Sequence, residues 1–140
     1  GLQTNPDPKA ALCRKKAVLE RLFNAEKKVI RQIASEGPCV IVGRLSNRIL
    51  RDHPNALHIF ISAAPDAKVR RVVDRDGLNE AQAAEKIKKV ERERANYCKY
   101  FSKTSWNSVD NYDMTFRSDR YGIEETADMI TEIVRRHSFR

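Results

Sequence analysis

Arginine side chains follow two short runs of apolar residues directly. Gly43-Arg44 comes after residues 39–42 (CVIV), and residues 117–120 (RSDR) come after residues 112–116 (YDMTF). A guanidinium can bind a phosphate through two parallel hydrogen bonds, and a glycine lets the backbone approach a ligand closely. Position alone favours plain turns with surface arginines at both places. The candidate phosphate-binding residues are Gly43, Arg44, Arg117 and Arg120.

A second concentration of positive charge lies between Lys68 and Lys103. Phosphoryl transfer needs aligned reactants and positive charge near the transferring oxygens rather than covalent chemistry from the protein. A basic helical hairpin that closes over nucleotides would supply both and would exclude water. The alternative is a solvated helix face, because the glutamates of this region can pair with basic residues three or four positions away. The basic residues include Arg70, Arg71, Arg75, Lys86, Lys88, Lys89, Arg92, Arg94 and Lys99.

The composition indicates a globular chain, and its positive charge fits either an anionic partner or a solvated basic surface. The 140 residues fit one domain, and the net charge of +8 suits a nucleic acid or a phosphorylated small molecule. No apolar run approaches the roughly 20 residues that a membrane span needs, and the start of the sequence does not resemble a signal peptide. The three cysteines and three histidines have no metal-type spacing, so we expect no metal site among them and a reducing, cytoplasmic location.

The elements that must position these side chains alternate between strands and helices. Residues 15–35, 65–76, 80–101 and 123–134 have the periodicity or end signals of helices, whereas residues 39–42, 57–63 and 112–116 are typical of strands. This order predicts a parallel sheet in a three-layer α/β/α fold. Ligands of such sheets bind beyond the carboxyl ends of the strands. Residues 43–44, 62–64 and 117–120 should therefore lie at the ligand-binding edge.

The predicted sheet is incomplete, because three strands leave a thin layer. We expect one domain over residues 1–140, in which residues 66–105 form a helical, lid-like region. A nucleotide kinase also needs a glycine-rich loop that holds the phosphates of ATP. The glycines at 1, 37, 43, 77 and 122 are too far apart to form one. We therefore expect an upstream strand, loop and helix that complete the sheet.

Several segments together resemble the cytidylate kinase-like family of P-loop nucleoside monophosphate kinases. They are VIRQIASEGPCVIVGR, ILRDHPNALHIFISAAPDAKVRRV, KIKKVERERANYCKYF, SWNSVDNYDMTF and GIEETADMI. The likeness covers roughly residues 19–134 and depends on the order of the segments rather than on one motif. It implies a P-loop kinase fold, ATP with Mg²⁺ as phosphoryl donor and a nucleoside monophosphate or similar small acceptor.

The resemblance also assigns roles to arginines. Arg44 takes the place of a family arginine that contacts the acceptor, although Leu45 follows it where cytidylate kinases have an aspartate. Arg70 and Arg71 match arginines at the front of the lid, and Arg92 and Arg94 lie in its second helix. The implied roles are catalytic for Arg71, Arg92 and Arg94 and substrate-binding for Gly43, Arg44 and Arg70. The position of Arg117 and Arg120 after residues 112–116 predicts a cofactor-binding role for them instead.

Two other functions remain open at this point. The basic helix over residues 80–101 could bind the phosphate backbone of a nucleic acid, although no nucleic-acid-binding motif accompanies it. A kinase-derived domain without catalysis could instead bind a nucleotide or a partner, because related folds often change function.

Overall fold

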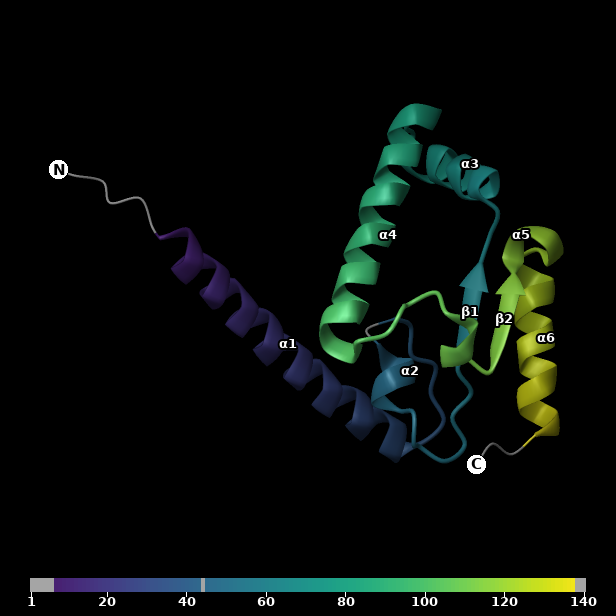
Figure 1. The fold of residues 1–140 in the computed structure, drawn as a ribbon. Helices are drawn as coiled ribbons and strands as arrows, with labels where there is room; N and C mark the ends of the chain where they lie inside the picture. Colours follow the sequence, from purple (N-terminus) through teal and green to yellow (C-terminus); the bar gives the residue numbers. More distant parts are fainter. Residues whose placement is uncertain (1–6, 44, 138–140) are drawn as a thin grey trace. The chain divides into compact units, whose positions relative to one another are not determined.

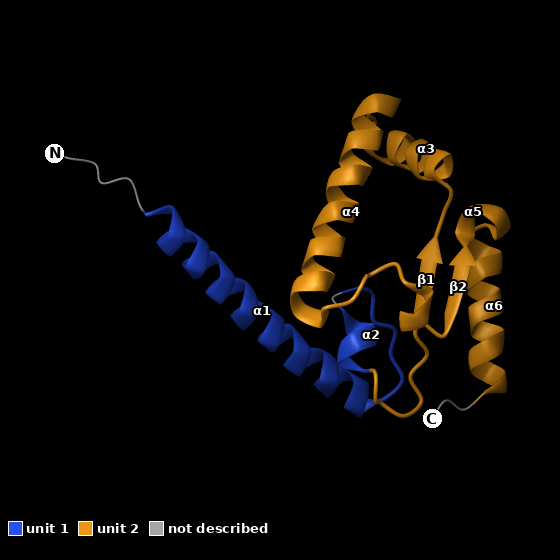
Figure 2. Cartoon of the chain, in the orientation of Figure 1, with its two compact units in different colours: residues 1–50 blue, residues 51–140 orange. Residues whose placement is uncertain are grey.

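The computed structural model describes residues 7–43 and 45–137. The described chain forms two compact units, residues 1–50 and residues 51–140 (Figure 2). The fold is mixed α/β, mostly helical, with a two-stranded parallel sheet. None of the described helices is both long enough and apolar enough to cross a membrane. The predictions of one domain and of a lid over residues 66–105 stay predictions.

The first unit contains a long helix, α1 (Pro8–Glu36), and a short helix, α2 (Ser46–Ile49). The helix α1 begins earlier than predicted, because the Asp7 side chain accepts a hydrogen bond from the backbone N–H of Lys9 and Pro8 occupies the first turn. It ends before Gly37-Pro38, as predicted.

The predicted strand over residues 39–42 is wrong. These residues form neither a helix nor a strand, and Val40 and Val42 are 93% and 88% exposed. A strand needs a neighbour for its backbone N–H and C=O groups, and among the described residues β1 and β2 pair only with each other. The apolar run thus has no described sheet partner, and its β-branched composition alone does not make it a strand.

The second unit contains the sheet. The strand β1 (Ile59–Ser62) runs parallel to β2 (Met114–Arg117), with Ile59 opposite Met114 and Ser62 opposite Arg117. Both strands confirm predictions within two residues at each end. The helices α3 (Pro65–Asp76) and α4 (Glu80–Ser102) connect the strands, so both carboxyl ends meet at one edge (Figure 1).

The remaining elements of this unit are short, apart from the last helix. A 3₁₀ turn, η1 (Val109–Asn111), precedes β2. The predicted turn after β2 is instead a one-turn helix, α5 (Ser118–Tyr121), which leads into α6 (Ile123–Arg136). The Ser118 hydroxyl donates to the backbone carbonyl of Ser62, so the starts of the segments after β1 and β2 are tied together.

Local sequence signals define the α3–α4 hairpin at its turn. Gly77 ends α3 in the left-handed conformation, with φ 67°. Asn79 and Gln82 then form a capping box, in which each side chain accepts from the other residue's backbone N–H. The chain thus leaves β1 and runs directly into a tightly connected hairpin (Figure 1).

We expect Gly77→Ala to lower the free energy of unfolding by about 1–2 kcal/mol, the cost of a left-handed conformation for a residue with a Cβ. A Cβ at this position would meet no atom within 4 Å, so the cost comes from the backbone alone. Gly77→Asn is the matched control and should lose less, because asparagine tolerates this conformation. Urea denaturation followed by circular dichroism measures both, and equal stability of the alanine variant and the wild type would contradict the prediction.

Candidate functional site

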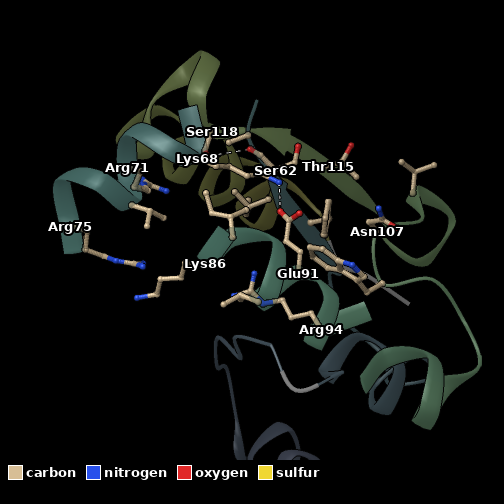
Figure 3. A pocket seen from close by; sticks show the side chains of 18 residues that line it. Ser62, Lys68, Arg71, Arg75, Lys86, Glu91, Arg94, Asn107, Thr115 and Ser118 are labelled. Carbon is tan, nitrogen blue, oxygen red and sulfur yellow. Dashed lines mark hydrogen bonds and ion pairs between the residues drawn. The ribbon is translucent and has the colours of Figure 1, made fainter. Parts of the chain in front are cut away.

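A cavity of about 600 Å³ lies at the carboxyl end of β1, beside the α3–α4 hairpin (Figure 3). The end of β1 and the loop that carries Trp106 line one part of the cavity. One face of α3 and one face of α4 line the rest. All of these residues belong to the second unit. The lining residues used below are Lys68, Arg71, Arg75, Lys86, Glu91, Arg94, Trp106, Asn107 and Thr115.

Helical spacing explains which side chains of the hairpin reach the cavity. On α3 they are Lys68, Arg71, Val72 and Arg75, and on α4 they include Ile87, Val90, Glu91 and Arg94. Both sets recur at i, i+3, i+4 and i+7, which places each on one helix face. A residue one position along a helix points about 100° away. The two facing stripes thus put positive charge from both helices on the same cavity.

The lining is strongly cationic. Five of its residues carry a positive charge, and Glu91 is its one carboxylate, so the formal charge is +4. Glu91 forms an ion pair with Lys68 and so links the two helices from inside the cavity (Figure 3). Clefts lined by charge of one sign concentrate ligands of the opposite sign. The cavity therefore has the size of a small-molecule site and the charge of an anion site.

Asp76 holds two of these cations at the closed end of the hairpin. Its carboxylate accepts from Arg75 at 2.7 Å and from Lys86 at 2.8 Å. These hydrogen bonds, first that of Arg75 and then that of Lys86, hold the pKa of Asp76 well below its ordinary value of 3.8. The ionised carboxylate therefore connects α3 to α4 and orients two cavity-lining side chains.

We expect Asp76→Asn to destabilise the protein at neutral pH. Since folding lowers the pKa of Asp76 from 3.8, its stabilising effect is complete above about pH 4 and disappears as the pH falls through the folded pKa. The gap in unfolding free energy between wild type and variant should therefore close on acidification. Asp74→Asn, on the same helix, is the matched control for lost charge. Urea titrations at several pH values test this, and a gap that stays constant down to about pH 2 would contradict it.

Trp106 connects the cavity to the sheet. Its ring packs edge-on against Phe60 of β1, with the ring centroids 5.3 Å apart, and Tyr112 packs on the same phenylalanine at 5.0 Å. The Tyr112 hydroxyl donates to the backbone carbonyl of Trp106, and burial raises the pKa of that hydroxyl. On the cavity side, the Arg94 guanidinium lies over the indole at 6.0 Å from the ring centroid. Trp106 is thus an aromatic surface that is held from the sheet side and faces an exposed cation.

The structure brings together some of the arginines singled out in the sequence. Arg71 and Arg94 both line the cavity. Arg70 and Arg92 sit one or two positions off the lining stripes and are exposed. Arg70 pairs instead with Asp66 at 2.8 Å, which lowers the pKa of that aspartate.

Arg117, the last residue of β2, has a partner outside the cavity. Arg117 makes two hydrogen bonds with Asp119, at 2.8 and 2.7 Å, and these hold the pKa of Asp119 below its ordinary range. Arg120 is exposed on α5. Neither lines the cavity. Gly43 belongs to the first unit, with φ 74°, and Arg44 lies outside the described residues.

Sequence reasoning missed several lining residues. The sequence places Lys68, Arg75 and Lys86 in the basic region between Lys68 and Lys103 but assigns them no individual role, and it does not single out Trp106. The signal was present in the i, i+3, i+4, i+7 pattern that joins Lys68 to Arg75. Among the residues that the structure describes, no group of three or more His, Cys, Asp or Glu side chains is arranged to hold a metal ion.

Comparison with known proteins gives this geometry a context. Residues 6–120 match the sequence profile of the cytidylate kinase-like family, which is most of the chain. The chain belongs to the cytidylate kinase-like family. The predicted resemblance is thereby confirmed.

Individual relatives of this cytidylate kinase-like chain are distant. A cytidylate kinase of Methanoculleus marisnigri is 26% identical over 106 residues, which are 76% of this chain and 56% of that protein. An uncharacterized protein from Eubacterium ventriosum, known from a crystal structure, is 28% identical with a TM-score of 0.70, covering 86% of this chain and 66% of the other. The chain thus spans less than two thirds of either relative.

Proposed function

We propose that the whole protein catalyses ATP-dependent phosphoryl transfer to a nucleoside monophosphate or a similar small acceptor. One observation carries this proposal. In a chain of the cytidylate kinase-like family, five cations and a single carboxylate line one small cavity at the carboxyl end of β1. The family relationship supports nucleotide kinase activity, and the charge of the cavity fits phosphates.

In the proposed reaction an oxygen of the acceptor phosphate attacks the γ-phosphorus of ATP. The new P–O bond forms as the bond from the γ-phosphorus to the bridging oxygen breaks, so ADP leaves with that electron pair. Arg71 and Arg94 would stabilise the charge on the transferring oxygens. Lys68, Arg75 and Lys86 would hold the flanking phosphates, because each already faces the cavity.

The proposal includes a larger fold than the described strands. The parallel pair β1–β2 would belong to a three-layer P-loop sheet, and the α3–α4 hairpin would be its lid. The described residues do not fit Mg²⁺, since the one carboxylate of the lining is paired with Lys68 and metal sites of this kind need free oxygen ligands. We propose that Mg²⁺ is held instead by a glycine-rich loop, which the 140 residues do not contain, while the cavity contacts phosphates of ATP from the other side.

The roles predicted from the sequence for the other candidate residues are part of this proposal. These residues are Gly43, Arg44, Arg70, Arg92, Arg117 and Arg120. The described geometry supports Arg71 and Arg94 more directly, because these two line the cavity. Alanine substitution at each of the other arginines measures its part in turnover.

An acceptor-dependent ADP-release assay on the full-length protein tests the function. With ATP, Mg²⁺ and a panel of nucleoside monophosphates, ADP formation should rise well above the rate without acceptor for at least one of them. ADP formation that no acceptor accelerates would contradict the proposal. A salt titration with single-stranded RNA addresses the nucleic-acid alternative, which predicts binding that weakens steeply with salt.

A further inference from the structure

The cavity differs in chemistry between its two ends. Four of its cations, Lys68, Arg71, Arg75 and Lys86, come from α3 and the first half of α4. The other end carries the amide of Asn107 and the hydroxyl of Thr115, which are neutral (Figure 3). The indole of Trp106, the neighbour of Asn107 in the chain, also lines the cavity and is neutral. A ligand that fills this cavity should therefore have an anionic end and a planar, hydrogen-bonding end.

Arg94 stands between the two ends. Its guanidinium lies 6.0 Å from the centroid of the Trp106 ring, at the outer limit of a cation–π contact. Stacked rings in a nucleic acid strand are about 3.4 Å apart. A ring stacked on Trp106 would lie closer to the indole than the guanidinium does now, so Arg94 would have to move away from the indole. Either Arg94 or a ligand ring can cover this face of the indole, but both cannot lie directly on it without moving apart.

The support behind Trp106 makes it a suitable stacking surface. Phe60 of β1 contacts the ring from the sheet side, and the Tyr112 hydroxyl fixes the backbone at the same residue. The indole is only partly exposed, whereas Arg94 is exposed at the end of a long, flexible side chain. A ligand would thus displace the arginine rather than the tryptophan.

We propose that Trp106 is the stacking surface for the base of a bound nucleotide, and that the base releases Arg94 from the indole toward the phosphates. Asn107 and Thr115 would meet the polar edge of the base, since an amide can offer both a donor and an acceptor. Binding of the base would thus move the positive charge of Arg94 toward the phosphates. This inference rests on the proposed nucleotide-binding function and adds to it the place of the base.

Trp106 is the single tryptophan of the sequence, so its fluorescence reports on this surface directly. The probes are ATP and inorganic tripolyphosphate, which share three phosphates and differ in the base. ATP should change the emission of Trp106 in a saturable way, whereas tripolyphosphate should bind by calorimetry with little change in emission. Equal changes for both ligands would overturn the proposal, because the signal would then come from the phosphates.

Substitution separates stacking from folding. Base stacking on an aromatic side chain is lost in Trp106→Leu, so its Kd for ATP should rise about 10-fold or more, within the range found for base–aromatic stacking. Trp106→Phe keeps a ring and should lose about 3-fold or less by the same argument. The Kd for tripolyphosphate should stay unchanged in both variants, which also shows that the cavity is folded. A Trp106→Leu variant that binds ATP as the wild type does, or loses both ligands equally, would overturn the proposal.

The stacking role of Trp106 and the proposed kinase activity can be contradicted separately. If the full-length protein transfers phosphate but ATP binding is insensitive to Trp106→Leu, the stacking surface is wrong and the function stands. If Trp106→Leu weakens ATP selectively but no acceptor is phosphorylated, the stacking surface stands and the kinase activity is wrong.

Discussion

Replacement of Arg71 by alanine should lower the turnover of phosphoryl transfer about 10²–10³-fold, the usual effect of removing a donor that stabilises a transition state. Arg71 comes from the lining face of α3. Among residues 7–43 and 45–137, no carboxylate forms an ion pair with it. Its guanidinium therefore has all its donors available to a ligand phosphate, whereas Arg75 and Arg117 each share theirs with an aspartate.

The measurement is the acceptor-dependent rate of ADP formation by the full-length protein at saturating substrates. Lys89→Ala is the matched control, because it removes a positive charge from the same hairpin at an exposed position outside the lining. It should stay within about threefold of the wild type, because surface changes of this kind have small effects. Arg71→Lys should recover only part of the rate, since lysine cannot make the two parallel hydrogen bonds of a guanidinium. Full turnover in Arg71→Ala would remove Arg71 from the site.

Replacement of Lys68 by methionine should weaken the binding of tripolyphosphate about 10- to 100-fold, the value of one or more hydrogen bonds to a charged group. Lys68 and Glu91 form the ion pair inside the cavity, and their side chains are 34% and 36% exposed. The substitution removes a cation and also leaves Glu91 unpaired beside the incoming anion. Both effects act against phosphate binding.

A double-mutant cycle separates these two effects. Glu91→Gln in the Lys68→Met protein removes the unpaired carboxylate, so it should recover part of the lost affinity. Glu91→Gln alone should bind tripolyphosphate at least as tightly as the wild type, because Lys68 is then released from its pair. Calorimetry measures all four proteins, with circular dichroism as a check on folding. If Glu91→Gln weakens tripolyphosphate binding both in the wild type and in the Lys68→Met protein, Glu91 supports anion binding and the expectation that it repels the anion is wrong.

Local signals in the sequence predicted the hairpin well. Pro65 and Gly77 stand at the two ends of α3, so these ends follow from short-range chemistry, whereas the Asn79–Gln82 capping box of α4 is found only in the structure. The parallel pairing of β1 and β2 was also predicted, because parallel strands need a long connection and the two helices supply one.

Features that depend on distant neighbours were harder to predict. Residues 39–42 have the composition of a buried strand, yet they are not a strand here, because pairing requires a partner that composition does not reveal. The sequence names Arg117 as a candidate phosphate-binding residue, but it does not reveal that Asp119, two residues along, pairs with its guanidinium. The position of Trp106 depends on its contact with Phe60, which lies 46 residues earlier in the sequence.

The central claim is that the whole protein transfers phosphate from ATP to a small acceptor through this cavity. Transfer of the labelled γ-phosphate of ATP to a nucleoside monophosphate, with the product identified by mass spectrometry, tests it most directly. The full-length wild type and the Lys89→Ala control should form the labelled diphosphate, and the Arg71→Ala Arg94→Ala protein should form it at least about 10²-fold more slowly. No labelled product from any monophosphate, or equal rates in all three proteins, would contradict the account.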